Sequence, residues 1–406
     1  MVIQLLDYFP ESSLSRTLNS LRHLSARQKG VALLAALVLM LGIVMVLSNI
    51  FYRHQIDVSQ ASSAALSDQA FLLALSVERW ARQRLSKKDG MDENTDVDHH
   101  GENWAQAVPL LPVEGGVIRG CLSDLQGRIN LNNFSLYASD PESLETELSA
   151  LSQGSVGIAS LWRNLLIMAD LPVTPARMAA VVDWLDSDSE LVNPWGAEQP
   201  DYDSLPRVVS NTLMSDATEL AAVAGYHVRE VQYLLPYITA LPLTGSPPKL
   251  MPTTVNINTA SENILLALGG EFSDAFAAVI LDTREEGSYF ETIETLYQAL
   301  EAALPISPGD AAKFWPSTLI GVRSDLFQLY LEVLLGDIEL RLKSTIDRRE
   351  NKENPVVMAR EMFLVPDIVS EPKLELAGYE TDESKEDADQ QRDSYRIQTA
   401  CEALGV

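Results

Sequence analysis

The chain has 406 residues, 46% of them hydrophobic, and a net charge of -27. This length allows two or three compact units in addition to a membrane segment, each with enough apolar residues to bury a core. The acidic excess argues against a nucleic-acid partner, because binding to DNA or RNA relies on Lys and Arg to neutralise phosphates. It is compatible with an extracytoplasmic domain and with divalent cations.

A basic segment ends directly before a long apolar run near the N-terminus. Residues 27–30 read Arg-Gln-Lys-Gly, and residues 31–51 contain no charged residue. About twenty apolar residues suffice to span a bilayer as one helix. A secretory signal has a shorter apolar core with small residues after it. Here Gly30 precedes the run, so cleavage after Gly30 would leave the helix on the mature protein. A generic single-pass anchor with a basic cytoplasmic flank is the alternative.

The helical pattern continues beyond the apolar run. Residues 52–85 contain neither Pro nor Gly, and apolar residues recur there at steps of three and four. This spacing predicts one helix from residue 31 to residue 85, about 80 Å long at 1.5 Å per residue. Only its second half needs an apolar face, which comprises Ala70, Leu73, Ala74, Val77, Ala81 and Leu85.

After this helix the sequence predicts a loop and then short strands. Residues 87–102 are polar and contain His99 and His100, which we interpret as a surface pair and not as metal ligands. Residues 116–122 have partly alternating polarity, Gln126-Gly127 suits a tight turn, and residues 129–132 resume the strand pattern.

Residues 143–300 are rich in Ala, Leu and Glu at helical spacing. Strand-like sequence returns at 318–324 and at 326–346, although the second of these segments could also form a helix. The acidic residues 371–406 have few aromatic side chains, which predicts a disordered tail. A helical block between two groups of strands indicates an insertion into a small α+β domain. The expected helices lie at 159–168, 175–185, 217–224, 228–238, 262–268 and 274–284.

A helical hairpin is predicted around the sequence Asn-Ile-Asn-Thr-Ala at residues 256–260. The Asn and Thr side chains are expected to cap a helix that begins near Ser261 and ends at Gly269-Gly270. A second helix follows from Phe276. The pattern resembles the helix-hairpin-helix family, whose DNA-binding members present backbone N–H groups to a phosphate. Acidic residues surround this turn, so we expect the hairpin to serve packing.

An acidic loop after the helix at 175–185 is the best candidate metal site. Alternating and closely spaced carboxylates there offer several hard oxygen ligands, which suit Ca²⁺ better than Zn²⁺ or Mg²⁺. The spacing is not that of an EF-hand, and a solvated acidic loop is the alternative. The candidate ligands are Asp186, Asp188, Glu190, Glu198, Asp201 and Asp203.

Two cysteines, Cys121 and Cys401, could form a disulfide in an oxidising compartment, or Cys121 could be a buried apolar residue. The sequence leaves this choice open. It contains no Gly-x-Ser-x-Gly motif and no phosphate-binding glycine loop, and its five histidines lack paired acids, so we expect no enzymatic activity.

Taken together, the chain resembles the minor pseudopilins of type II protein secretion, the GspK family. The motifs occur in order over nearly the whole chain: the Gly30-Val31 junction, Glu-Arg-Trp-Ala at 78–81, Asp-Leu-Gln-Gly-Arg-Ile-Asn-Leu-Asn-Asn at 124–133, Asp-Trp-Leu-Asp-Ser-Asp at 183–188 with Gly-Ala-Glu at 196–198, the Asn256 segment, and Ser-Asp-Leu-Phe at 324–327.

The resemblance implies an α+β, pilin-like fold with a large inserted α-helical domain that binds calcium. It implies cleavage between Gly30 and Val31 by a prepilin peptidase, and a single-pass inner-membrane protein with a periplasmic body. The expected segments are a leader (1–30), a transmembrane and stalk helix (31–88), the pilin-like domain in two parts (89–140 and 318–366), the insertion (141–317) and the tail (367–406).

The resemblance also implies partners. These are two other minor pseudopilins, GspI-like and GspJ-like, in a complex at the tip of a periplasmic fibre, with secreted proteins as further contacts. Most pilins carry Glu at the fifth mature position, whereas this chain has Ala35. A carboxylate without a partner is costly in a membrane, so Ala35 suits a subunit with no neighbour above it. Val31 departs from the usual aromatic residue or Met, which puts N-methylation in doubt, and the leader is long.

Three other functions are compatible with parts of this pattern. A minor pilin of a type IV pilus would share the Gly30 junction but normally lacks so large an insertion. A membrane-anchored DNA receptor would share the helical hairpin, yet it should be basic. A periplasmic hydrolase would require a nucleophile that the sequence does not nominate.

Overall fold

The computed structural model describes residues 11–86, 97–105, 108–149, 157–202, 207–246, 249–270 and 272–365. Its first element is helix α1 (Glu11–Leu85), which begins twenty residues before the predicted start at Val31. Contacts divide the chain into two units, Met1–Asp68 and Gln69–Val406. Within the described residues, Val31–Leu85 is the one helix long and apolar enough to cross a membrane. Its apolar side chains from Val31 to Phe51 are exposed.

The last part of α1 belongs to the second unit and has the predicted apolar face. Ala70, Ala74, Val77, Ala81 and Leu85 are buried. A carboxylate that the apolar spacing did not place there lies on the same face: Glu78 is buried and accepts a hydrogen bond from Ser344 (2.7 Å).

Arg360 lies against the same carboxylate, with its Nε atom 2.7 Å from Glu78 Oε2. These contacts place the last part of α1, from Gln69 to Leu85, against one face of the main sheet. The Glu78 charge is stable in this position because it is hydrogen-bonded and paired.

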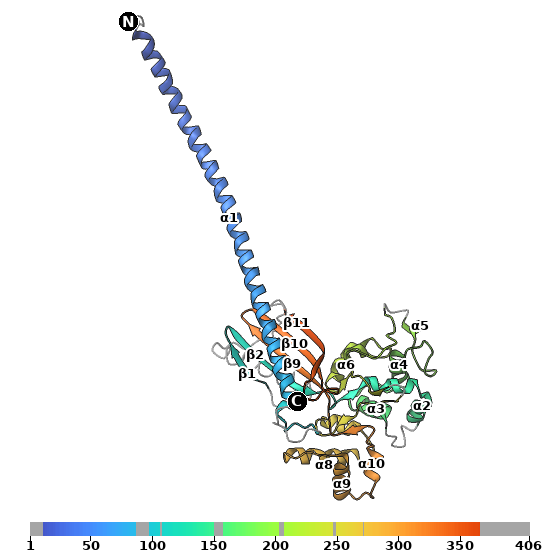
Figure 1. Cartoon of the computed structure of the whole chain (residues 1–406). Coiled ribbons are helices and arrows are strands. Elements are labelled where there is room, and N and C mark those ends of the chain that lie inside the picture. Colours follow the sequence, from blue (N-terminus) through green and yellow to red (C-terminus); the bar gives the residue numbers. More distant parts are fainter. Residues whose placement is uncertain are drawn as a thin grey trace, which may run out of the picture. The chain divides into compact units, whose positions relative to one another are not determined.

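Five antiparallel strands form this sheet in the order β1-β2-β9-β10-β11 (Figure 1). The segment at 326–346, whose pattern was ambiguous, forms two long strands joined by a tight turn. β2 pairs with β9, although about two hundred residues separate them in sequence. The strands are β1 (Val108–Val113), β2 (Gly116–Asp124), β9 (Leu326–Leu335), β10 (Ile338–Asp347) and β11 (Val356–Val365).

The two faces of the sheet differ in polarity, as alternating side chains require. The face that includes Ser344 and contacts α1 is apolar, with Leu122 and Leu329 opposite each other on β2 and β9. The other face, which we call the polar face, carries Arg119, Cys121 and Ser123 from β2, Gln328, Tyr330 and Glu332 from β9, and Arg341, Lys343 and Thr345 from β10.

The two edges of the sheet are also unlike. Edge strand β1 contains Pro109 and Pro112, which have no N–H to donate, and its register shifts between Val108 and Leu111. Edge strand β11 has no internal proline, and its side chains Val356, Met358, Phe363 and Leu364 are exposed.

The segment between β2 and β9 is mainly helical and has one large apolar core of its own. Its elements are η3 (Leu131–Ala138), α2 (Pro141–Ser149), α3 (Ile158–Met168), α4 (Pro175–Leu185), α5 (Gln199–Tyr202), η5 (Ala217–Ala222), α6 (Val228–Leu234), η6 (Leu235–Tyr237), α7 (Glu262–Ala267), α8 (Ser273–Glu285), α9 (Ile293–Ala303) and α10 (Asp310–Phe314). A short 3-10 helix, η2 (Asn103–Ala105), precedes β1.

Short strand pairs also occur in this segment: β3 (Ile129–Asn130) with β4 (Ile238–Thr239), β5 (Thr244–Ser246) with β6 (Lys249–Met251), and β7 (Val255–Asn256) with β8 (Ile320–Gly321). The predicted strand at 129–132 is therefore only two residues long and joins β4, not the main sheet. Leu131, Phe134 and Tyr137 of η3 lie in the helical core, although the sequence analysis assigned residues 89–140 to the pilin-like part.

In this segment, asparagine side chains form hydrogen bonds with backbone groups that the short strands do not pair. Asn132 donates to Met214 O (3.0 Å) and accepts from Met214 N (2.9 Å). Asn133 forms the same two-way pair with the backbone of Thr253. These pairs satisfy buried peptide groups that no neighbouring strand reaches.

The hairpin prediction is confirmed in outline and wrong in its capping. Helices α7 and α8 are separated by Gly269 and Gly270, which have φ values of +77° and +94° that favour glycine. Neither Asn258 nor Thr259 caps α7, and the N-cap Ser261 makes no side-chain cap bond. Asn258 instead forms a two-way pair with the backbone of Phe290, because the buried loop at 290 needs a partner.

Candidate functional site

Helix α4 positions the acidic loop that follows it. Thr174 caps the helix by accepting from Arg177 N, and Pro175 occupies the first turn. The helix ends at Asp186, whose backbone turns to an extended conformation (ψ 170°). This turn directs the Asp186 carboxyl group into the loop formed by residues 186–198.

Asp183, on the last turn of α4, holds the loop in shape. Its buried carboxylate accepts hydrogen bonds from Val192 N (2.9 Å) and Ala197 N (2.7 Å). Gly196 is needed for this approach, because a Cβ atom there would lie 2.0 Å from Asp183 Oδ2. The loop is thus a defined structure and not a loose acidic surface.

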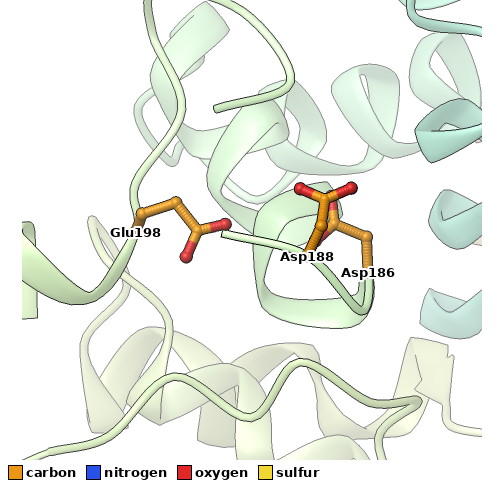
Figure 2. Close-up of side chains that lie close together, drawn as sticks. All are labelled: Asp186, Asp188 and Glu198. Atoms are coloured by element: carbon orange, nitrogen blue, oxygen red, sulfur yellow. The ribbon is translucent and has the colours of Figure 1, made fainter. Parts of the chain in front are cut away.

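Three carboxyl groups meet at this loop. Asp186, Asp188 and Glu198 each offer one oxygen, and these oxygens all lie within 4.8 Å of one another. Figure 2 shows Glu198 facing the two aspartates from a separate stretch of the loop. Asp186 and Glu198 are buried, whereas Asp188 is exposed.

The electrostatics of this cluster are unfavourable without a cation. Burial raises the pKa of Asp186 to about 7, and the carboxylates of Asp188, Asp183 and Glu198 add to that rise. Burial raises the pKa of Glu198 as well, with a further contribution from Asp183. For Asp183, burial raises the pKa to about 6 against the lowering effect of its two backbone hydrogen bonds.

The cluster fits a calcium ion. Oxygens that bind one Ca²⁺ at about 2.3–2.6 Å must lie within about 5 Å of one another, as these do. Asp186 Oδ1 and Glu198 Oε1 are buried and have no hydrogen-bond partner among the residues that the structure describes. Buried carboxylate oxygens without donors are costly, and coordination to a cation would satisfy them.

Of the five predicted ligands that the structure describes, it brings together three. Glu190 is exposed, and its backbone N–H bonds to Asp188 Oδ1 (2.8 Å) in a tight local turn. The Asp201 carboxylate accepts from Glu198 N (3.0 Å), which draws it to the start of α5. Asp203 lies outside the described residues.

The predicted cleavage junction is helical. Gly30 and Val31 both lie inside α1, and Val31 and Ala35 are exposed. The structure therefore places the junction at a point where the helix is continuous. Of the predicted histidine pair, His99 stacks on the ring of Tyr289 (3.7 Å between centroids) and His100 contacts Thr259 O (3.2 Å).

A buried polar network that the sequence analysis missed joins the sheet to the helical segment. Asn256 Nδ2 donates to Asp98 O (3.0 Å), Asp124 Oδ2 (3.2 Å) and Ser324 Oγ (2.9 Å). Asp98, expected in a solvated loop, is fully buried and forms an ion pair with Arg348.

The same network connects the two points where the chain passes between the sheet and the insertion, after β2 and before β9. Leu125 N donates to Leu326 O (3.1 Å), and Asp325 N donates to Gln126 Oε1 (2.6 Å). Arg348 Nε and Nη2 both donate to Ser324 O. The sequence feature that could have indicated this network is the presence of polar residues at both points, Asp124 and Gln126 after β2 and Ser324 and Asp325 before β9.

Comparison with known proteins places these features in a family. The family model described as type II secretion system (T2SS), protein K, matches residues 127–243, and a second model with the same description matches 255–313. Both matches fall in the segment between β2 and β9, which contains the acidic loop and the helical hairpin.

Curated relatives extend the similarity to most of the chain. Type II secretion system protein K of Aeromonas hydrophila is 30% identical over 342 residues, covering 83% of this chain and 97% of that protein. The protein of the same name from Pseudomonas aeruginosa is also 30% identical, covering 82% and 93%. About a fifth of this chain thus lies outside the shared part.

A solved structure supports the fold. The chain is similar to a chain in the crystal structure of the GspK-GspI-GspJ complex of enterotoxigenic Escherichia coli, with a TM-score of 0.56 and 21% identity. That likeness covers 75% of this chain and 99% of the other. An N-terminal helix on an antiparallel sheet with a helical insertion is the pilin-like fold that the resemblance implied. The chain belongs to the family of type II secretion system protein K.

Proposed function

We propose that this chain is a minor pseudopilin of a type II secretion system. Its apolar helix would anchor it in the inner membrane, and the unit that begins at Gln69 would lie in the periplasm. The observation that carries this proposal is membership of the protein K family, combined with an exposed apolar helix directly after the basic Gly30 junction. The role is structural, in assembly and export, and not enzymatic.

The membrane segment supports a position at the tip of the fibre. Counted from Val31, the fifth residue is Ala35, where most pilins have a Glu that pairs with a neighbouring subunit. A subunit without a neighbour above it has no use for that carboxylate, which is costly in the bilayer when unpaired. The chain would start fibre assembly there, in a complex with GspI-like and GspJ-like pseudopilins, and so promote export of folded proteins.

The mature N-terminus tests the pseudopilin class. Mass spectrometry of the full chain, isolated from membranes that contain a prepilin peptidase, should show a start at Val31. Replacing Gly30 with a bulky residue should leave the leader attached, because the peptidase needs a small residue at the cleavage point. An intact leader on the unaltered protein would reduce it to an ordinary anchored protein.

Complex formation tests the tip role separately. Co-expressed with GspI-like and GspJ-like partners, the chain should elute as a stable heteromer in gel filtration. A chain that remains monomeric with every candidate partner would contradict the tip role, even if the leader is cleaved.

Calcium binding by the acidic loop is a further part of the proposal. Asp186, Asp188 and Glu198 would hold the ion, because one oxygen of each lies within 4.8 Å of the others, and because Asp186 and Glu198 each have a buried oxygen without a hydrogen-bond partner in the described part of the chain. Calcium would draw the Glu198 stretch of the loop to the end of α4. Added to chelated protein, Ca²⁺ should raise the thermal unfolding midpoint, with about 2.7 kcal/mol of stabilisation at a hundredfold excess over the dissociation constant.

Two variants make the calcium test specific. Asp186→Ala should lose the shift of the unfolding midpoint, whereas Glu190→Gln, outside the three-carboxylate cluster, should keep it. If the unaltered chain shows no shift, the site is wrong. If Asp186→Ala shifts as much as the unaltered chain, the ligands are wrong.

A further inference from the structure

A neutral side chain from a different stretch of the chain contacts the acidic loop. Asn211 lies in the irregular segment 207–216, between α5 and η5. Its amide Nδ2 donates a hydrogen bond to the backbone oxygen of Asp188 (2.5 Å). Asp188 contributes a carboxylate to the three-carboxylate cluster, so this bond places the Asn211 amide beside the cluster.

Other contacts hold the same segment along the loop. The side chain of Gln199, next to Glu198, donates to Arg207 O (3.3 Å) and accepts from Val209 N (3.1 Å). The position of Asn211 relative to the acidic loop thus depends on three hydrogen bonds and not on one.

The backbone at Asn211 is unusual for a residue other than glycine. Its φ angle is +47°, in the left-handed region, which asparagine tolerates better than most residues. Such conformations persist where the surrounding structure holds them, and they are frequent at functional sites. The bond from Asn211 to Asp188 is one contact that holds the backbone here.

The amide oxygen of Asn211 is the atom that indicates a function. Oδ1 is buried and has no hydrogen-bond partner among the residues that the structure describes. Burying an amide oxygen without a donor is costly. Two carboxylate oxygens of the cluster, Asp186 Oδ1 and Glu198 Oε1, share this property.

These three oxygens differ from the other buried side-chain oxygens without a hydrogen-bond partner in the described part of the chain. The hydroxyl groups of Ser160 and Ser261 can rotate and donate. Glu339 Oε1 lies 2.5 Å from Arg341 Nη2 in an ion pair. The remaining three are one amide oxygen and two carboxylate oxygens, which only accept when the carboxyl groups are ionised. A single cation at the loop would satisfy all three.

We propose that Asn211 is a fourth side-chain ligand of the calcium ion, bound through Oδ1 together with Asp186, Asp188 and Glu198. The inference rests on the calcium binding proposed above and deepens it, because it names a ligand from outside the acidic loop. Calcium takes about six to eight oxygens, and carboxylates, side-chain amides and waters all serve. A neutral amide adds an oxygen to the three-carboxylate cluster without adding a fourth negative charge.

A ligand at this position would extend the effect of calcium beyond the loop. Further along the same segment, Met214 is held by the side chain of Asn132. Asp216 caps η5 and forms an ion pair with Lys343 of β10 (2.8 Å). Calcium bound to Asn211 would therefore fix one part of a segment whose other end contacts the sheet.

Two substitutions at residue 211 separate ligation from support of the loop backbone. Asn211→Gly keeps the left-handed backbone and loses the oxygen, whereas Asn211→Asp keeps an oxygen in the same place and loses the N–H donor to Asp188. Both are made in the full chain and titrated calorimetrically with Ca²⁺ at pH 8 after chelation. Asn211→Gly should bind at least about 10-fold more weakly, since even outer partners of metal ligands contribute about 10–100-fold. Asn211→Asp should bind at least as tightly as the unaltered chain.

A neighbouring residue provides the control for disturbance of the segment. Ser210→Ala removes a hydrogen bond to Thr212 and leaves Asn211 intact, so it should bind calcium as the unaltered chain does. Unchanged affinity in Asn211→Gly would overturn the proposal. Equal weakening in Asn211→Gly and Asn211→Asp would overturn it as well, because the N–H donor and not the oxygen would then be what matters.

Bound terbium gives a readout that a merely supporting residue would not change. Tb³⁺ takes the place of Ca²⁺ at oxygen sites, and its luminescence lifetimes in H₂O and D₂O report how many water molecules it coordinates. Asn211→Gly should bind Tb³⁺ with one more water than the unaltered chain, and Ser210→Ala with the same number. An unchanged number of waters in Asn211→Gly would contradict ligation by Asn211.

These outcomes are distinct from failure of the calcium site itself. If the unaltered chain binds neither Ca²⁺ nor Tb³⁺, the site and the role of Asn211 are both wrong. If binding is lost in Asp186→Ala and unchanged in Asn211→Gly, the role of Asn211 alone is wrong. Cleavage at Gly30 and heteromer formation report on the pseudopilin class whatever the result at Asn211.

Discussion

Asp183 organises the acidic loop without belonging to the three-carboxylate cluster. Its two backbone hydrogen bonds fix Val192 and Ala197, and with them the approach of Glu198 to Asp186. Sequence spacing nominated Asp186, Asp188 and Glu198, because alternating carboxylates suggest a metal loop. It could not separate these from Glu190 and Asp201, since the choice depends on where the folded loop places each side chain: Glu190 is exposed, and the Asp201 carboxylate accepts from Glu198 N.

Calcium binding should release protons near neutral pH. Burial and neighbouring carboxylates raise the pKa of Asp186 to about 7 in the metal-free protein, and a metal ligand has to be deprotonated. Affinity should therefore weaken as the pH falls below 7, by up to about tenfold per pH unit for one proton. Calorimetric titration at pH 7 in two buffers of different ionisation enthalpy measures the released protons.

The carboxylate outside the cluster provides the control for that titration. Glu190→Gln should release as many protons as the unaltered chain, whereas Asp186→Asn should bind calcium weakly and release fewer. A binding heat that does not depend on the buffer would contradict the role of Asp186.

Among the elements, the short connections between helices depend on asparagine side chains as much as on backbone ladders. The sequence predicted the helices α3, α4 and α8 from their apolar spacing, but it left the segment 326–346 open between strand and helix and named no strand at 356–365. It misassigned residues 131–132 as a strand and residues 258–259 as helix caps. In both places a buried asparagine bonds to a backbone segment far away in sequence, and no local pattern reveals such a partner.

Asn132→Ala should destabilise the helical segment. The substitution removes the hydrogen bonds to the N–H and C=O groups of Met214, at a cost of about 2–6 kcal/mol for two buried groups left without them. Chemical unfolding of the full chain measures the loss. Asn263→Ala is the matched control, because that side chain is exposed and its hydrogen bond is to the side-chain Oη of Tyr237 (2.9 Å), not to buried backbone groups. Equal stability of the two variants would contradict this account.

Asp124, in the network between sheet and insertion, should make stability depend on pH. Burial raises its pKa from 3.8 to about 6, against hydrogen bonds from Ser324, Thr259 and Gln126, and Asp98 adds to the rise. The folded state then binds more protons than the unfolded state between about pH 4 and pH 6. Stability should fall over that window as the pH rises, by about 3 kcal/mol for two units of pKa difference.

The pH slope is the informative measurement for Asp124, because a substitution there also disturbs its hydrogen bonds. Asp124→Asn should lower stability at every pH and remove this component of the slope. If the variant keeps the full slope between pH 4 and pH 6, another group is responsible.

On the scale of the whole chain, the insertion enters and leaves the sheet at one place. β2 ends at Asp124 and β9 begins at Leu326, and the two strands are directly paired at Asp124 and Phe327. The sequence order of strands, helices and strands predicted an insertion. It did not show that the two crossings are neighbours, because strand pairing across two hundred residues has no local signal.

The insertion should therefore be removable without loss of the sheet. Joining Leu125 to Leu326 through a two-residue Asn-Gly turn matches the antiparallel pairing of β2 and β9. The shortened chain should keep a cooperative thermal transition and strand-rich circular dichroism, and it should lose any response to calcium. A chain that does not fold would show instead that the network around Asn256 is needed to hold the sheet together.

The unlike edges of the sheet limit how such molecules can associate through their backbones. Pro109 and Pro112 interrupt the row of donors on β1, so the unpaired backbone groups of β11 form the only unbroken edge among the described strands. An endless stack of sheets needs two open edges in every member. With one edge closed, pairing through β11 stops at two sheets. A sheet of this kind is thereby unsuited to growth into amyloid-like ribbons through its backbone edges.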